Sequence, residues 1–149
     1  MKLYLESSVF NFIFAEDAPE KQKITKVFFA NKLNDFDLFI SDLVINELEK
    51  TKEPKRSALL ELITNHPFKT LATNEEASKL ARIYVSEGII PEKFLNDALH
   101  IAIASLNEIG TIVSWNLEHI VKVKTMIGVN KINLNRGYKQ IFIVTPEEI

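Results

Sequence analysis

The sequence predicts an α/β domain with a central, mainly parallel sheet. Short apolar strand-like segments alternate with helical ones, and no glycine- or serine-rich linker interrupts the 149 residues. Hydrophobic residues make up 46% of the chain and charged residues 26%, as in ordinary globular proteins. Because strands separated by helices favour parallel pairing through right-handed crossovers, we expect a single domain over residues 1–149.

The first half of the chain alternates two strands with three helices. Alternating leucines indicate the first strand, and apolar residues at helical spacing indicate the first helix. Ser41 or Asp42 can cap the second helix, and Pro54 suits the first turn of the third. The expected segments are the strand Lys2 to Glu6, the helix Glu20 to Leu33, the strand Asp37 to Ser41, the helix Leu43 to Lys50 and the helix Pro54 to Asn65.

The second half continues the alternation. Asn74 and Asn116 can cap helices, Gly88 can end one, and Pro91 can introduce another. The expected segments are the strand Lys69 to Ala72, the helix Glu75 to Ser86, the helix Phe94 to Leu106, the strand Thr111 to Trp115, the helix Leu117 to Ile127 and the strand Ile141 to Thr145.

Asp97 is the most informative residue of the chain. It lies near the start of a helix that is otherwise nearly all apolar. A buried carboxylate is unfavourable unless something pairs with it, so its presence indicates a charge kept for a cation or a reaction. The alternative is a helix-start carboxylate, exposed or favoured by the helix dipole.

Polar residues follow the strands at the points where parallel sheets form their sites. Glu6 closes the first strand, Glu47 lies in the helix after the second, and Asn116 follows the strand that ends at Trp115. A cluster of these residues with Asp97 is therefore geometrically plausible.

Each of the other candidates also has a plain structural interpretation. Glu6 taken alone is best interpreted as a solvated strand-edge residue, and Asn116 most simply as a helix cap. Glu47 could equally belong to an exposed helix face, although its spacing from Leu43 and Val44 places it on the side of the helix with apolar residues. For His100, we favour a core histidine with satisfied hydrogen bonds over a hydrogen-bond partner of Asp97. For His119 the expectation is a contact near a helix cap.

The composition excludes several kinds of chemistry. With no cysteine, the chain has neither disulfides nor thiolate zinc sites, and it has no Gly-rich phosphate loop or Ser/His/Asp triad. The net charge of −2 means that nucleic-acid binding would need a local basic patch. Carboxylate oxygens select hard divalent cations such as Mg²⁺ or Mn²⁺, which activate water for phosphodiester hydrolysis.

No stretch is long enough to span a membrane and the start carries an early charge, so we expect a cytoplasmic protein.

Several motifs, in order and over essentially the full chain, resemble the PIN domain family. Its usual Asp-Ser-Ser turn corresponds to Glu-Ser-Ser here, and the chain carries the Trp-Asn found in one branch. The matching stretches are Leu3 to Val9, Ile40 to Glu49, Asn96 to Ala102, Val113 to Val121 and Thr145 to Glu148.

The resemblance implies a three-layer α/β/α domain with a central parallel sheet. It also implies a Mg²⁺- or Mn²⁺-dependent endoribonuclease acting on single-stranded RNA, in the VapC-like branch of toxins from VapBC-type toxin–antitoxin pairs. Such toxins are commonly homodimers that a small antitoxin inhibits. By this resemblance Glu6, Glu47 and Asp97 would bind the metal ion, while Asn116 would orient a water molecule or help a ligand.

Other residues receive expected roles from the same resemblance. Ser7 would contribute a hydroxyl or backbone N–H near the first acid. The basic run after the second motif, which could meet RNA phosphates, comprises Lys50, Lys52, Lys55 and Arg56.

The chain departs from the family at its first acid, where Glu6 replaces the usual Asp, and Asn116 is neutral where many relatives carry Asp. Because Mg²⁺ demands near-ideal geometry, a longer side chain can weaken the site. The alternative function is therefore a catalytically impaired PIN-like module that binds RNA or a protein. A third interpretation is a flavodoxin-like binder of a small molecule, although the chain lacks a phosphate loop.

Overall fold

The computed structural model describes all 149 residues and contains one five-stranded sheet whose four strand pairings are all parallel. The strand order is β3-β2-β1-β4-β5. The strands are β1 (Lys2–Leu5), β2 (Asp37–Ser41), β3 (Lys69–Leu71), β4 (Thr111–Val113) and β5 (Phe142–Val144). The expected central parallel sheet is thus confirmed.

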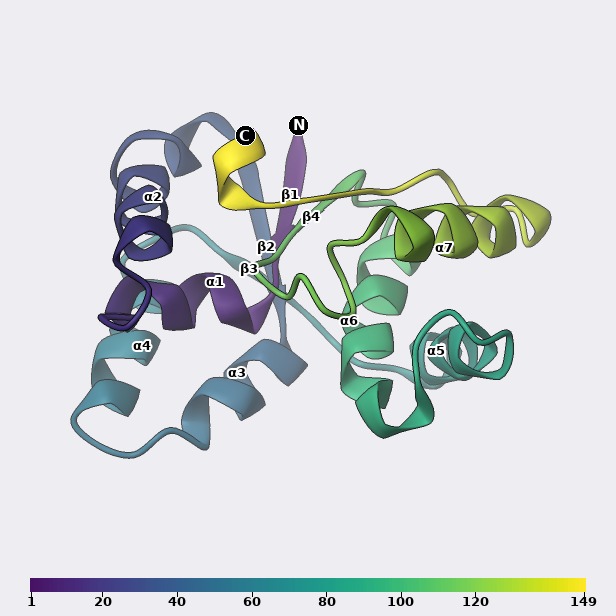
Figure 1. Cartoon of the computed structure of the whole chain (residues 1–149), viewed down its shortest axis with the longest axis horizontal. Helices are drawn as coiled ribbons and strands as arrows, with labels where there is room; N and C mark the ends of the chain where they lie inside the picture. The colour runs from purple at the N-terminus through teal and green to yellow at the C-terminus, as the bar shows by residue number, and fades with distance from the viewer.

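Helices cover both faces of this sheet and make a three-layer α/β/α sandwich (Figure 1). The helices on one side are α1 (Ser7–Asn11), α2 (Pro19–Asn31), α3 (Asp42–Glu49) and α4 (Lys55–Thr64). Those on the other side are α5 (Glu75–Ser86), α6 (Leu95–Leu106) and α7 (Val123–Asn135). Short 3₁₀ turns join them at Phe12–Phe14, Leu33–Asp35, Glu92–Phe94 and Pro146–Glu148.

The chain order reverses in the middle of the sheet. From β1 it proceeds outward to β2 and β3, then returns to the other side of β1 to form β4 and β5. Leu5 at the end of β1 pairs with Val113 at the end of β4, so the two strands finish side by side. A crevice at such a reversal is where open α/β sheets bind ligands.

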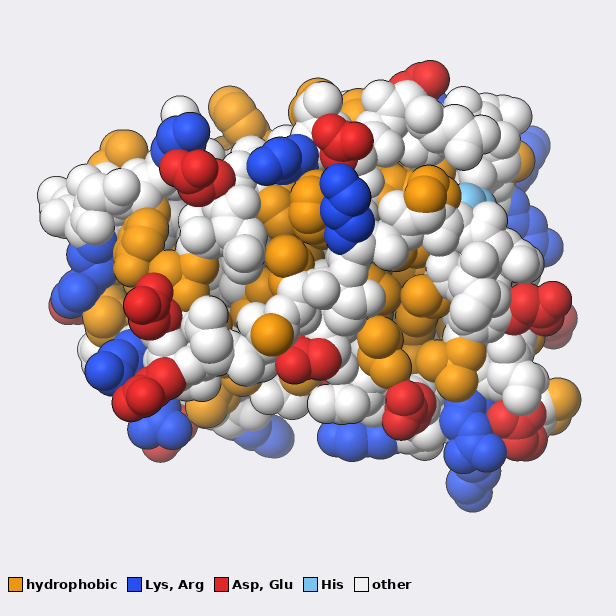
Figure 2. Space-filling model, turned by 180° about the vertical axis from the view of Figure 1, so that it is seen from behind, with side chains coloured by type: hydrophobic (Ala, Val, Ile, Leu, Met, Phe, Trp, Pro, Cys, Tyr) orange, Lys and Arg blue, Asp and Glu red, His pale blue; other side chains and the backbone are white.

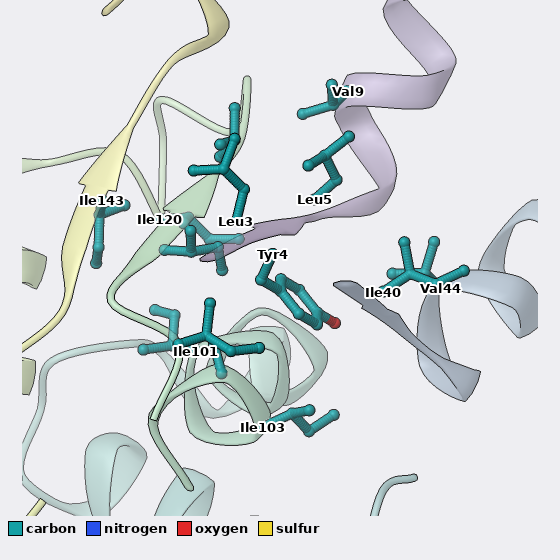
Figure 3. Packing of buried hydrophobic residues seen from close by; sticks show 14 of the residues in the cluster. Leu3, Tyr4, Leu5, Val9, Ile40, Val44, Ile101, Ile103, Ile120 and Ile143 are labelled. Carbon is teal, nitrogen blue, oxygen red and sulfur yellow. The ribbon is translucent and has the colours of Figure 1, made fainter. Parts of the chain in front are cut away.

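The core is built around β1, the central strand. Leu3, Tyr4 and Leu5 are fully buried because strands and helices surround them on all sides. Figure 3 shows Leu3 and Leu5 pointing toward Val9 of α1, while Tyr4 points to the opposite face, beside Ile101 of α6. Successive side chains of β1 therefore point to opposite faces of the sheet and pack in the apolar layers on both sides.

Several local signals act as the sequence predicts. The Ser41 hydroxyl accepts a bond from the backbone N–H of Val44 (3.4 Å) and caps α3. Asn74 caps α5 in the same way, accepting from the N–H of Ala77 at 2.9 Å. Gly88, with φ of +76°, lies in the left-handed region just after α5 ends.

The expected helix from Leu117 to Ile127 is wrong. The side chain of Asn116 accepts a bond from the N–H of His119, and the carbonyl of Asn116 accepts from Ile120 and Val121, which closes a turn instead. The helix α7 begins at Val123 and continues to Asn135. The bond from the N–H of His119 to the Asn116 side chain has the pattern of a helix cap, but only a single turn follows it before α7 begins.

A second difference follows β1. No element is expected from the sequence between the first strand and the helix at residue 20, but α1 and a 3₁₀ turn occupy residues 7–14. Five residues are too few for a helical period to be recognised, and the N-cap that starts α1 is a glutamate, which is not among the common capping residues.

The surface does not separate charges by sign. Figure 2 shows acidic and basic side chains interspersed over the face opposite that of Figure 1. None of the helices is both long enough and apolar enough to cross a lipid bilayer.

Candidate active site

The predicted site residues come from four elements that meet where the strand order reverses. Glu6 follows β1, Glu47 lies in α3 after β2, Asp97 lies in the first turn of α6, and Asn116 follows β4. Carboxylate oxygens of Glu6 and Glu47 and a ring nitrogen of His100 all lie within 4.8 Å of one another. Asp97 is outside this tightest group, but the charges of Glu6 and His100 both affect its pKa.

Glu6 is buried, with only 6% of its surface exposed. Its Oε1 accepts hydrogen bonds from the hydroxyls of Ser8 and Ser114, each at 2.6 Å, and its Oε2 accepts from the backbone N–H of Ser8 at 3.1 Å. Taken alone, Glu6 was expected to be a solvated edge residue, and this is wrong. The strand β1 is central, so its end lies inside the molecule.

Two serines therefore tie the first acid to the end of β4. The hydroxyl of Ser8 also accepts from the N–H of Trp115 (2.8 Å), and that of Ser114 accepts from the N–H of Asn116 (2.9 Å). Sequence reasoning gave neither serine this role. The available signals were the position of Ser8 two residues after an acid at a strand end and that of Ser114 directly after another strand.

Glu47 faces the interior of the site, unlike its neighbours Glu49 and Lys50, which are exposed. Its Oε1 accepts bonds from the Ser7 hydroxyl and from Nε2 of His100, each at 2.6 Å. Burial raises the pKa of Glu47, but the bonds from His100 and Ser7 and the charge of His100 outweigh it, so the pKa is lowered. Ser7 thus bonds the second acid rather than the first.

Asp97 is half-buried and has a raised pKa. Burial is the largest cause, and the negative charge of Glu6 adds to it. The charge of His100 and a hydrogen bond from the Asn116 side chain offset the rise only in part. Ionised Asp97 is therefore held in surroundings that disfavour its charge, which is common at functional sites.

No lysine or arginine forms an ion pair with these acids. Glu6 and Asp97 form no ion pair, and the ion pair of Glu47 is with His100. Buried carboxylates of this kind need a cationic partner. The donor set is dominated by carboxylate and amide oxygens, so it fits a hard divalent cation such as Mg²⁺ or Mn²⁺.

His100 is fully buried, as expected for a core histidine with satisfied nitrogens. Its Nδ1 lies 2.7 Å from the hydroxyl of Tyr4 and its Nε2 lies 2.6 Å from Oε1 of Glu47. Burial lowers its pKa, but the bond to Glu47 and the charges of Glu6 and Glu47 produce a net rise. Its hydrogen-bonding acid is Glu47 in α3, not Asp97 one turn earlier in the same helix.

Asn116 and His119 shape the other side of the site. Asn116 caps a turn through its bond to the N–H of His119 (2.9 Å). The imidazole of His119 stacks on the ring of Phe94 with centroids 3.8 Å apart. The side chain of Asn116 is thereby held by the turn that follows it.

The basic run after α3 is exposed, and the loop that carries it lies at the same lower edge of Figure 1 as the carboxyl ends of the strands. Arg56 pairs with Glu53 at 2.9 Å, which leaves three lysines without an acidic partner. The charge of Lys50 contributes to the lowered pKa of Glu47. Lys50 therefore offers positive charge near Glu47.

No family model and no curated protein matches the sequence. Solved structures do match the fold, and three of them each share 15% identity with this chain. One of them is VapC20 of Mycobacterium tuberculosis, a sarcin–ricin-loop-cleaving toxin. The match covers 78% of this chain and 92% of the VapC20 chain, with a TM-score of 0.60.

The other two structures are complexes bound to DNA. One is VapBC2 from Rickettsia felis, bound to a fragment of its promoter. The match with one of its chains covers 97% of this chain and 98% of that chain, with a TM-score of 0.54. A chain of VapBC from Salmonella typhimurium covers 98% of both chains, with a TM-score of 0.56. At this identity the likeness concerns the fold, and it confirms the PIN-like architecture expected from the motifs.

Proposed function

We propose that this chain, which has the fold of VapC toxins, is a divalent-metal-dependent endoribonuclease that cleaves single-stranded RNA. One observation carries the proposal: Glu6, Glu47, Asp97 and Asn116 surround the reversal point of the sheet, and no lysine or arginine pairs with the three acids. Such a pocket attracts a cation and, through it, the phosphate of a nucleic acid.

Glu6, Glu47 and Asp97 would hold one Mg²⁺ or Mn²⁺ ion. When bound, the ion activates water and neutralises charge on the phosphate. Asn116, held by the turn at His119, would orient the attacking water through its side-chain amide. Ser7 would hold the carboxylate of Glu47 in place.

RNA would approach over the exposed lysines of the run that follows α3. Lys50, Lys52 and Lys55 have no acidic partner and can contact phosphates electrostatically. Since the net charge of the chain is −2, binding would depend on this local patch and weaken as salt rises.

We further propose that the chain is the toxin of a VapBC-type pair, acts in the cytoplasm, forms a homodimer and is inhibited by a small antitoxin. The support is the likeness of fold to chains of two VapBC complexes. Growth arrest on expression, relieved by co-expression of a short neighbouring reading frame, would test the pairing. Sedimentation of the purified protein would test the dimer.

The direct test of the enzyme is cleavage of single-stranded RNA with Mn²⁺ by wild type, Asp97→Asn and Asp42→Asn. Asp42 is a suitable control because it is also a half-buried acid in the first turn of a helix, but its carboxylate accepts bonds from Thr73 and is not in the metal-ligand group. We expect Asp97→Asn to lose about 100-fold or more in rate, as when one group that stabilises the transition state is removed. Equal cleavage by wild type and Asp97→Asn would refute the assignment.

A second candidate is a non-catalytic PIN-like module that binds RNA or a protein. The observation in its favour is that Ser8 and Ser114 already engage both oxygens of Glu6. Calorimetric titration with Mn²⁺ separates the two functions. Binding that disappears in Asp97→Asn supports the nuclease, and absence of binding by wild type supports the module. A large gain of activity in Glu6→Asp would show that the natural site is impaired.

A further inference from the structure

We propose that His100 is a positioning residue of the acidic site, which holds the carboxylate of Glu47 through its Nε2–H while Tyr4 and Ser41 fix the orientation of its ring. The purpose of this arrangement, to prepare Glu47 for a cation, rests on the proposed function. The hydrogen-bond chain itself is independent of that function and can be tested in the metal-free protein.

This hydrogen-bond chain joins four elements of the fold. Ser41, at the end of β2, lies 2.7 Å from the hydroxyl of Tyr4 in β1, which lies 2.7 Å from Nδ1 of His100 in α6. Nε2 of the same ring lies 2.6 Å from Oε1 of Glu47 in α3. Ser41, Tyr4 and His100 are fully buried, so water does not compete for these bonds.

The donors and acceptors are consistent with hydrogen bonds that all run in one direction, from Ser41 through Tyr4 and His100 to Glu47. The N–H of Val44 donates to the Ser41 oxygen, so the Ser41 proton is free to go to the oxygen of Tyr4. Burial raises the pKa of Tyr4, which therefore keeps its own proton and can donate it to Nδ1 of His100. A neutral ring that accepts at Nδ1 carries its proton at Nε2, directed at Glu47. A charged ring also donates from Nε2.

The effect on Glu47 is to leave one oxygen available. Both hydrogen bonds to its side chain, from Ser7 and from His100, go to Oε1, and none goes to Oε2. His100 does not serve as a ligand here, since both of its nitrogens are already bonded. Partners that orient a ligating carboxylate typically change metal affinity by about 10–100-fold when removed.

The first experiment measures the ring of His100 in the metal-free protein by long-range proton–nitrogen NMR. We expect Nε2 to carry a proton in wild type, and Tyr4→Phe to shift the nitrogen signals because Nδ1 loses its partner. A ring protonated at Nδ1 alone, with a bare Nε2, would overturn the proposal. This outcome does not depend on whether the protein is a nuclease.

The second experiment compares Mn²⁺ affinity in two tyrosine variants, Tyr4→Phe and Tyr84→Phe. Tyr84 is the matched control, since it is also fully buried and its hydroxyl also contacts two side chains, those of Ser105 and Asn133. We expect a loss of about 10-fold or more in Tyr4→Phe and no change in Tyr84→Phe. Equal losses in both would indicate a general effect of stability and overturn the positioning role.

Two further variants separate the ring nitrogens, with folding checked by circular dichroism. In His100→Gln the amide can replace Nε2 and still donate to Glu47, whereas in His100→Asn it reaches only the position of Nδ1. We expect His100→Gln to keep Mn²⁺ affinity within a few-fold and His100→Asn to lose about 10–100-fold. Wild-type affinity in a folded His100→Asn would refute the proposal. If wild type binds no Mn²⁺, the proposed function fails, and the NMR signals still decide on the bond.

Discussion

Replacing Asp97 with Asn should change stability in opposite directions with and without a divalent cation. Burial raises the pKa of Asp97, and the charge of Glu6 raises it further. A carboxyl group whose pKa is higher in the folded than in the unfolded state destabilises the fold when it is ionised. The neutral amide removes this effect, so the metal-free variant should be more stable than wild type at pH 7.

The expected gain in the free energy of unfolding is roughly 0.5–2 kcal/mol, the range common for substitutions that relieve a destabilised site. For a chain of this length, it corresponds to a rise in Tm of roughly 1–8 °C. The gain should be complete above the folded-state pKa of Asp97. It should shrink as the pH falls toward the ordinary value of 3.8, because the wild-type carboxyl then becomes protonated too.

Mn²⁺ should reverse the order. At about 100 times its Kd, a ligand that binds only the folded state stabilises it by about 2.7 kcal/mol, and a variant that lacks one ligand should gain less. Thermal unfolding followed by circular dichroism, with and without Mn²⁺ and at several pH values, measures all of these effects. A metal-free Asp97→Asn less stable than wild type at pH 7, or a gain that does not depend on pH, would refute the reasoning.

Two further predictions concern buried contacts. Ser114→Ala removes a donor that lies 2.6 Å from the buried carboxylate of Glu6, so urea unfolding should show a loss of roughly 1–3 kcal/mol, and an unchanged midpoint would contradict this. Gly128→Ala would place a methyl group 2.8 Å from Cγ1 of Ile89, and we expect a loss of about 1–3 kcal/mol. Gly110→Ala is the control, because nothing lies within 4 Å of its added methyl group, and it should unfold at nearly the wild-type urea concentration.

Much of the fold could be predicted because the relevant signals are local. The caps at Ser41 and Asn74 and the helix end at Gly88 depend on residues within one turn, and each acts as expected. The prediction failed at Asn116, where the same residue type that caps a helix closes a turn instead. A side-chain bond to the N–H three residues ahead is common to a helix cap and to a turn, so the local sequence does not tell the two apart.

For the candidate site, the sequence identified acids and the strand ends near them, but not the groups that hold those acids. Ser114 lies 108 residues from Glu6, and His100 lies 53 residues from Glu47. His100 had the signature of a core histidine, and it is one. Only the tertiary structure, which places Glu47 beside it, shows that His100 also contacts an acid.

By itself, the sequence determined the alternation of strands and helices and the order of the acidic motifs, because hydrophobic periodicity and capping act over a few residues. Only the tertiary structure decided that β1 and β4 end side by side, with Glu6 buried between two serines. It also decided that one oxygen of Glu47 is held while the other stays free. The physical reason is that a side chain's hydrogen-bond partners are set by which strands pair and how helices pack across the sheet, and these contacts join residues far apart in the chain.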